Sequence, residues 1–143
     1  MTEIERGKSA GRSDSWMRLE EAARATFWGY LGCEVVQADS RQSLIRLKLR
    51  PEHLNLLGIV HGGVLASLMD NAMGLVVMIG SPDDKTVTAN MNIQYLKSAN
   101  SGTLSCEARL VHRSRRSFTL QSSIYGEDGD LLAWGSGSFR LVI

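Results

Sequence analysis

The side chains best suited to chemistry gather in one short stretch, Asn55-Leu-Leu-Gly-Ile-Val-His61-Gly62-Gly63, with Asp70 eight residues after Gly62. The two glycines begin a long apolar segment. The first N–H groups of a helix there would have no intrahelical partner and could bind an anion or a developing oxyanion. Glycine also lets a ligand approach the backbone closely, so we expect Gly63 as well as Gly62 to contact substrate. A carboxylate among apolar residues, such as Asp70, is costly unless it is paired, hydrogen-bonded or placed in a cleft.

Helix geometry constrains how these groups could cooperate. Gly62 and Asp70 are separated by roughly 12 Å along a helix axis, at about 1.5 Å per residue. One reacting carbonyl cannot easily contact both groups of the same chain. If both act on it, they come from different chains, and the site lies at a homodimer interface. The face that carries Asp70 also carries small residues that leave room for a substrate or a neighbouring chain: Gly63, Ala66, Ser67 and Gly74.

Hydrophobic periodicity predicts the elements that position these residues. Apolar residues at helical spacing, including Trp16, Leu19, Ala23, Phe27 and Tyr30, predict a helix over roughly 15–28. Alternating apolar and polar residues predict a strand at 45–50, which stops at Pro51. We expect one or two strands in all between the first helix and the next. The apolar segment 61–79 is too long for a buried strand and is predicted to be a helix, ended by turn residues.

Four alternating segments follow, over 87–95, 103–110, 118–124 and 131–142, with Asp128-Gly129 as a hairpin turn. Antiparallel strands around one buried helix imply an α+β architecture, with the sheet curled around the helix. We expect Trp16, Phe27 and Trp28 to serve in packing rather than to form a ligand cage.

Length and composition predict one soluble domain. The chain has 143 residues and a net charge of +1. We expect residues 1–14 to form a flexible tail and 15–143 to form a single domain. The near-neutral charge gives no reason to expect a nucleic-acid partner. The apolar run 59–79 carries polar groups, among them Asp70 and Asn71, that would be costly in lipid, so we expect a buried helix and no membrane partner.

The two cysteines, Cys33 and Cys106, form no CxxC pair and no spacing with histidine that is typical of a metal site. We therefore expect no bound metal. Free thiols suit a reducing compartment, and no apolar signal core is visible at the N-terminus, so we expect a cytoplasmic protein.

The pattern N-x-x-G-x-x-H-G-G from Asn55 to Gly63, followed by Asp70, resembles the PaaI-type hotdog-fold thioesterases, which are related to 4-hydroxybenzoyl-CoA thioesterases. The segment from Thr88 to Lys97 is also similar to the family strand that follows the helix, and the resemblance covers about 30–143. It implies a hotdog fold, in which an antiparallel β-sheet is wrapped around a long central α-helix. It also implies hydrolysis of a fatty or aromatic acyl-CoA without a cofactor, since coenzyme A is part of the substrate. The resemblance does not specify which acyl group is hydrolysed.

The same resemblance implies roles for individual residues. Asp70 matches the family's general base or nucleophile, and Gly62 matches the glycine whose N–H binds the thioester oxygen. Asn55 and His61 match the residues that flank this oxyanion site, and Thr88 matches a hydroxyl that helps to position the attacking water. The family site is divided between two subunits, which implies at least a homodimer and points to a homotetramer.

Simpler interpretations exist for each candidate. Asp70 could be a structural carboxylate, His61 a helix cap, and Thr88 an ordinary residue on the polar face of its strand. Arg115 and Arg116 follow Arg113 between two strands, where they form either a solvated turn or a clamp for the phosphates of coenzyme A.

Two other functions are compatible with the pattern. A dehydratase or hydratase acting on acyl thioesters usually needs a His paired with a carboxylate, whereas His61 is expected beside the oxyanion site. A non-catalytic acyl-CoA-binding or sensor domain would have little reason to keep Asp70 beside an apolar pocket. Hydrolysis by an acyl-CoA thioesterase is therefore the leading hypothesis.

Overall fold

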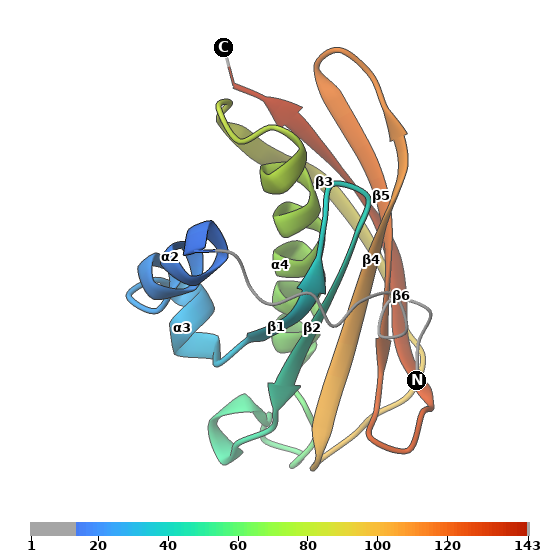
Figure 1. Cartoon of the computed structure of the whole chain (residues 1–143). Helices are drawn as coiled ribbons and strands as arrows, with labels where there is room; N and C mark the ends of the chain where they lie inside the picture. The colour runs from blue at the N-terminus through green and yellow to red at the C-terminus, as the bar shows by residue number, and fades with distance from the viewer. Residues whose placement is uncertain (1–13, 143) are drawn as a thin grey trace.

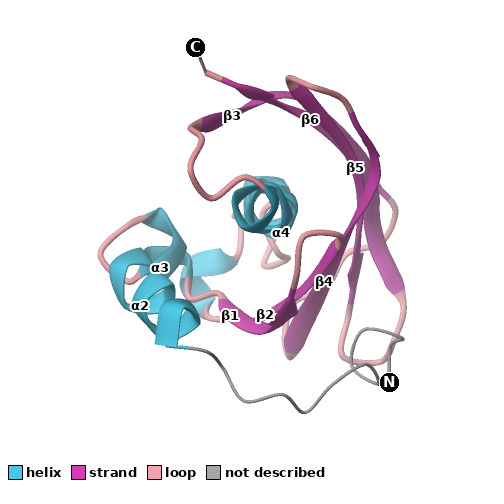
Figure 2. Ribbon diagram, turned by 45° about the horizontal axis from the view of Figure 1, so that its top comes forward, coloured by secondary structure: helices cyan, strands magenta, loops and turns pink. Residues whose placement is uncertain are grey.

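One long helix, α4 (Gly62–Gly80), is surrounded on most sides by a curved antiparallel sheet. The computed structural model describes residues 14–142. Six strands form the sheet in the order β1-β2-β4-β5-β6-β3, and α4 runs along its concave side (Figure 1). Figure 2 views α4 end-on and shows the strands curving around it. The predicted α+β architecture, a sheet wrapped around one central helix, is confirmed.

The strands are β1 (Glu34–Ala38), β2 (Gln42–Lys48), β3 (Thr86–Tyr95), β4 (Thr103–Arg113), β5 (Ser117–Tyr125) and β6 (Leu131–Leu141). The four segments predicted after the long helix correspond to β3, β4, β5 and β6. The predicted turn joins β5 to β6: the Gly126 N–H donates to the Asp130 carbonyl at 2.9 Å, and Gly129 has a φ of 89°, which favours glycine. The strand predicted at 45–50 ends earlier, at Lys48, because the 3-10 turn Pro51–His53 begins soon after it.

The hydrophobic core lies between α4 and the concave face of the sheet. Its buried α4 side chains are Leu65, Leu68, Met69, Ala72, Met73, Leu75, Val76 and Val77. Two contacts hold the helix close to the sheet. The Ser43 hydroxyl of β2 donates a 2.7 Å hydrogen bond to the Ala72 carbonyl. On β6, a Cβ at Gly137 would lie 2.8 Å from the end of the Met73 side chain, so glycine permits this approach. By length and composition α4 could cross a membrane, but here it packs as the core helix of the chain.

The prediction of one helix over 15–28 is wrong, because the segment forms two helices, α2 (Asp14–Ala23) and α3 (Phe27–Leu31). At the break, the Thr26 hydroxyl donates a 2.6 Å hydrogen bond to the Ala23 carbonyl. This bond turns the chain before α3 begins. The predicted tail at 1–14 lies outside the described residues, apart from Asp14 at the start of α2.

The break also changes which aromatic side chains are covered. Gly29 lies directly on the Arg24 carbonyl, since a Cβ there would be 2.0 Å from that oxygen. Phe27 is 56% exposed and stacks on Tyr30, so its packing contact lies at the surface and not in the core. Trp28 does pack against the core, as expected. The side chain of Trp16 lies outside the described part of the chain.

The sheet leaves one side of α4 open. Figure 2 shows this opening between β3 on one side and the pair α2–α3 on the other.

Candidate active site

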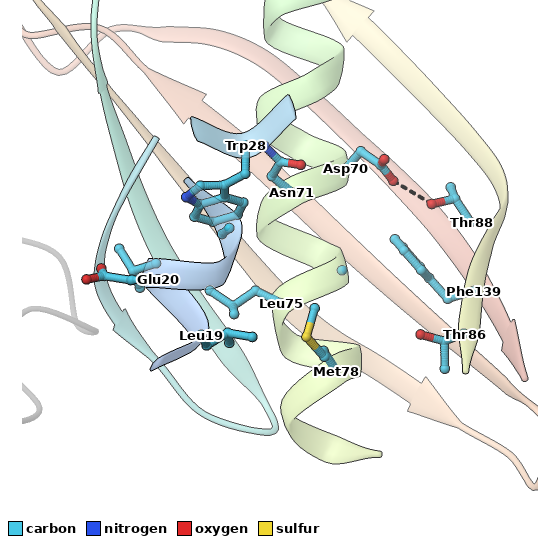
Figure 3. A pocket seen from close by; sticks show the side chains of 13 residues that line it. Leu19, Glu20, Trp28, Asp70, Asn71, Leu75, Met78, Thr86, Thr88 and Phe139 are labelled. Carbon is cyan, nitrogen blue, oxygen red and sulfur yellow. Dashed lines mark hydrogen bonds between the residues drawn. The ribbon is translucent and has the colours of Figure 1, made fainter. Parts of the chain in front are cut away.

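A mostly apolar groove follows the open side of α4. Its floor is α4, and its walls are α2–α3 on one side and β3 with β6 on the other (Figure 3). The cavity measures about 250 Å³. Its apolar lining includes Leu19, Trp28, Leu75, Met78 and Phe139. No described lining residue is Lys, Arg or His, so the groove suits the uncharged part of a ligand.

Asp70 lies half-buried in this groove, on the side of β3. Its Oδ1 accepts a 2.6 Å hydrogen bond from the Thr88 hydroxyl. A hydroxyl that donates to a carboxylate makes a strong, charge-assisted bond, which fixes the orientation of the carboxylate. The Thr88 oxygen still has lone pairs that can accept a hydrogen bond from water. The structure therefore brings together two of the predicted site residues from separate elements.

Thr88 does not lie on the polar face of its strand, contrary to the simpler interpretation of this residue. Thr88 pairs with Phe139 of β6, but the next pair is Asn90 with Ser138, so Ala89 is an extra residue in a β-bulge. Thr88 lines the groove, and Met91, three positions later, packs against the core on the same side of the sheet. Regular alternation would place these two side chains on opposite faces. The bulge is therefore what turns Thr88 toward Asp70.

His61 caps the N-terminus of α4, in agreement with the simpler interpretation of this residue. Its Nδ1 accepts a 2.7 Å hydrogen bond from the Gly63 N–H. The Gly62 N–H, by contrast, donates to no group within residues 14–142. The Tyr95 hydroxyl donates to the Gly62 carbonyl at 3.1 Å and helps to hold this glycine in place. Gly62 therefore presents an open donor at the positive end of the helix dipole, whereas the Gly63 donor is engaged.

Asn55 organises the loop that leads into α4. Its Oδ1 accepts hydrogen bonds from the N–H groups of Leu57 and Ile59, at 2.9 and 3.3 Å. The same loop projects Leu56 and Leu57, whose exposed fractions are 106% and 83%. Asn55 thus stabilises the conformation of the loop that leads to Gly62.

Within one chain, the two halves of the predicted site stay apart. Asp70 and Thr88 lie in the apolar groove, whereas His61 and Gly63 line a second depression near the start of α4. Gly62 and Asp70 belong to the same unbroken helix, so their eight-residue spacing corresponds to roughly 12 Å. Each half lacks the groups that the other supplies.

The arginine run lies at the C-terminal end of α4. The Arg113 guanidinium donates to the Gly80 carbonyl at 2.9 Å and to the Ser81 hydroxyl at 2.8 Å. A cation is favourable at a helix C-terminus, so Arg113 has a structural role. Arg115 and Arg116 are exposed in the turn between β4 and β5. This turn lies near the C-terminal end of α4, whereas Gly62 and Gly63 lie at its N-terminal end.

Neither cysteine is suited to act as a nucleophile. Burial raises the pKa of the Cys33 thiol to about 11 and that of the Cys106 thiol to about 12. The reactive form of cysteine is the thiolate, which is scarce at neutral pH when the pKa is so high. Among the described residues, no group of three or more His, Cys, Asp or Glu side chains could hold a metal ion. The Asp70 carboxylate remains the candidate reactive group of the groove.

Sequence reasoning misses most of the groove that surrounds Asp70. The pattern predicts Trp28 only as a packing residue and does not single out Met78 or Phe139. One signal for Met78 is present, because Asp70, Gly74 and Met78 follow each other at four-residue steps on one helical face. Phe139 and Trp28 come from distant elements, and only the folded chain places them beside Asp70.

Comparisons with known proteins find several relatives. A family model described as the thioesterase superfamily matches residues 57–133. Human acyl-coenzyme A thioesterase 13 is 31% identical over 68 residues, which are 48% of this chain and 49% of that protein. A variant of the phenylacetic acid degradation protein PaaI from Thermus thermophilus has a TM-score of 0.74 and 27% identity, covering 81% of this chain and 98% of that one. A thioesterase from Haemophilus influenzae shares the fold, with a TM-score of 0.83 at 17% identity, covering 94% and 92% of the two chains.

Proposed function

The chain belongs to the thioesterase superfamily, and on that basis we propose that it is an acyl-CoA thioesterase, which hydrolyses a fatty or aromatic acyl-CoA to the free acid and CoA. One observation carries this proposal: the Asp70 carboxylate is held by the Thr88 hydroxyl inside an apolar groove. The likeness to a human acyl-coenzyme A thioesterase supports a CoA thioester as the substrate. The proposed reaction needs only water, and coenzyme A enters as part of the substrate.

In the proposed reaction, Asp70 acts on the thioester carbonyl. It is either the general base, which takes a proton from the attacking water, or the nucleophile itself. Addition to the carbonyl carbon gives a tetrahedral oxyanion. When this intermediate collapses, the C–S bond breaks and the departing CoA thiolate takes up a proton. If water was the nucleophile, the free acid is formed directly; if Asp70 was, the acyl-aspartyl anhydride is then hydrolysed by a water molecule, which releases the acid and restores the carboxylate. Thr88 keeps the carboxylate in place, and the Gly62 N–H stabilises the oxyanion with the help of the helix dipole.

In the proposed site, Asp70 comes from one protomer and the Gly62 N–H from its partner. Roughly 12 Å of helix separates the two groups within a chain, which is too far for one carbonyl. A twofold dimer solves this problem, because each chain then gives its carboxylate to one site and its helix N-terminus to the other.

The free edge of the sheet supports such a dimer. β3 is an edge strand, and the segment from Thr86 to Leu96 contains no charged residue. Native edge strands are usually protected by charges, proline or a covering segment, so a long uncharged edge is a template for pairing. Leu56 and Leu57 are also more exposed than large apolar side chains normally are in a monomer. We propose a second copy of this chain as the partner, in at least a homodimer, and a homotetramer of two dimers as the full assembly.

The contacts of the histidine beside α4 favour hydrolysis over dehydration. A dehydratase would need an imidazole paired with a carboxylate as acid and base. His61 is instead bound to the Gly63 N–H, and Asp70 is bound to Thr88.

Turnover by the Asp70→Asn protein tests the proposal. The amide is nearly isosteric but cannot act as a base or nucleophile, so kcat should fall by at least about 10²-fold, the scale of general-base contributions. Released thiol is measured with short, medium, long and aromatic acyl-CoAs, with and without EDTA. The matched control is Asp84→Asn, an exposed aspartate outside the groove, which should leave the rate unchanged.

Two results would contradict the proposal. A near-normal rate for a folded Asp70→Asn protein would remove Asp70 from the mechanism. Tight binding of acyl-CoA by the wild type, without thiol release from any member of the panel, would replace hydrolysis by a sensor role. We expect EDTA to leave the rate unchanged, and a fall would show that a metal ion takes part.

A further inference from the structure

Gly74 lies in the middle of α4, where glycine destabilises a helix relative to alanine. Packing does not explain its presence. A Cβ built on Gly74 would lie 3.6 Å from the nearest ring carbon of Phe139, which is an ordinary van der Waals distance. Gly29 is different, because a Cβ there would meet a backbone oxygen at 2.0 Å. The missing side chain at Gly74 therefore calls for a reason other than lack of space.

The groove supplies such a reason. Gly74 lies between Asp70 and Met78 on one helical face, and all three residues line the groove. Figure 3 shows Asp70 and Met78 at two levels of α4, with Phe139 on one wall and Trp28 on the other. A side chain at position 74 would stand in the path from the carboxylate to Met78.

The dimensions of this path suit a medium-sized acyl group. The two turns from Asp70 to Met78 span roughly 12 Å. An extended chain advances by about 1.2 Å per bond, so roughly ten bonds fit into that length. The volume agrees: an apolar cavity of about 150 Å³ already accommodates benzene, and this groove measures about 250 Å³. Met78 stands at the far end and is 46% exposed, although it is large and apolar.

We propose that the groove holds the acyl group of the substrate, that Gly74 keeps its path open, and that Met78 limits the length of chain accepted. This inference rests on the proposed thioesterase function. The substrate class is an uncharged acyl group, either medium-chain or arylalkyl. A second carboxylate on the acyl group would meet Asp70, and no described lining residue is a cation that could neutralise it. The phosphates of CoA must lie outside the groove for the same reason.

Gly74→Ala tests this assignment by adding one methyl group to the groove floor. The helix should become more stable, so the melting temperature should rise. The ratio of kcat/KM for octanoyl-CoA to that for butyryl-CoA should nevertheless fall by about tenfold or more, because overpacking by a methyl group is costly in a filled site. The matched control is Gly80→Ala in the same helix. A Cβ there would lie 3.5 Å from the Arg113 guanidinium and outside the groove, and the ratio should stay unchanged.

Met78→Ala provides a second variant that acts in the opposite direction. It enlarges the far end of the groove, so the preferred acyl chain should lengthen by a few carbons. An unchanged chain-length profile in both the Gly74→Ala and Met78→Ala proteins, with the wild type active, would overturn the groove assignment and leave thioester hydrolysis standing. No thiol release by the wild type from any acyl-CoA would instead overturn the proposed function, and this inference with it.

Discussion

At the scale of single residues, the hydrogen bond from the Thr88 hydroxyl to Asp70 is the contact on which the candidate site depends. Both residues line the apolar groove, and a hydrogen bond to a charged group is stronger than one between neutral groups. The bond also joins α4 to β3, so it positions the carboxylate relative to the groove walls. A change at Thr88 should therefore affect the chemistry more than the fold.

Thr88→Val keeps the shape of the side chain but removes the donor. We expect kcat for acyl-CoA hydrolysis to fall by about 10- to 100-fold, the rate equivalent of a hydrogen bond to a charged group. Thr88→Ser retains the hydroxyl and should keep most of the activity. Steady-state kinetics on both proteins, with circular dichroism to check folding, makes the comparison. Equal activity of the valine and serine variants would show that the hydroxyl is dispensable.

Cys106 predicts how stability depends on pH. Burial raises the pKa of its thiol from 9.0 to about 12. The folded chain thus keeps a proton that the unfolded chain loses. The resulting stabilisation is complete below about pH 9 and is lost as the pH rises from there toward 12. Urea unfolding across this range should show a steeper loss of free energy of unfolding for the wild type than for Cys106→Ala, which has no thiol. Parallel curves for the two proteins would contradict this expectation.

At the scale of elements, regular hydrophobic patterns predict the fold well. α4 and most of each strand that follows it keep a regular hydrophobic period, and tertiary contacts preserve it. Two local departures change the exposure or the face of a side chain. The break between α2 and α3 depends on the bond from Thr26 to Ala23, and the bulge at Ala89 depends on pairing with β6. Neither this hydrogen bond nor this strand pairing can be read from hydrophobic periodicity. The face on which Thr88 lies and the exposure of Phe27 could therefore not be predicted from the sequence.

The contact between α3 and the turn that follows α2 can be tested at Gly29. A Cβ in Gly29→Ala would meet the Arg24 carbonyl oxygen at 2.0 Å, so the backbone must shift. We expect the free energy of unfolding to fall by roughly 1–3 kcal/mol, the usual scale of overpacking. Gly74→Ala is the comparison, because its new Cβ has ordinary contacts and should stabilise the helix. Urea unfolding measures both, and a Gly29→Ala protein as stable as the wild type would show that the close contact is not maintained in solution.

The turn between β4 and β5 is a separate element with its own prediction. If Arg115 and Arg116 bind phosphates of CoA, their replacement by Ala should raise KM for acyl-CoA by about tenfold and leave kcat nearly unchanged. A truncated thioester without the nucleotide should be affected much less. The matched control is Arg24→Ala, which removes an exposed arginine that lies outside the β4–β5 turn. Equal effects on both substrates, or none on either, would leave the run as a solvated turn.

At the scale of the whole molecule, the proposed site is complete only when two chains assemble. The chain exposes an uncharged edge strand, β3, and two leucines on the loop that leads to Gly62. Any contact that brings this loop to the Asp70 of a second chain would also bury Leu56 and Leu57. A twofold axis makes that contact reciprocal, so one interface would complete two sites at once.

Subunit mixing tests whether each site is shared. Asp70→Ala removes the reactive carboxylate, and Asn55→Ala removes the acceptor that holds the Leu57 and Ile59 N–H groups of the loop. Each protein alone should be nearly inactive, because all of its sites carry the same defect. After partial unfolding and joint reannealing, a heterodimer would contain one doubly damaged site and one intact site. Random assortment should then restore about one quarter of the wild-type activity. Mass spectrometry of intact dimers, with one variant uniformly labelled with ¹⁵N so that the two chains differ in mass, verifies the exchange, and mixing either variant with itself is the control. Verified heterodimers without recovered activity would show that Asp70 and the loop act within one chain.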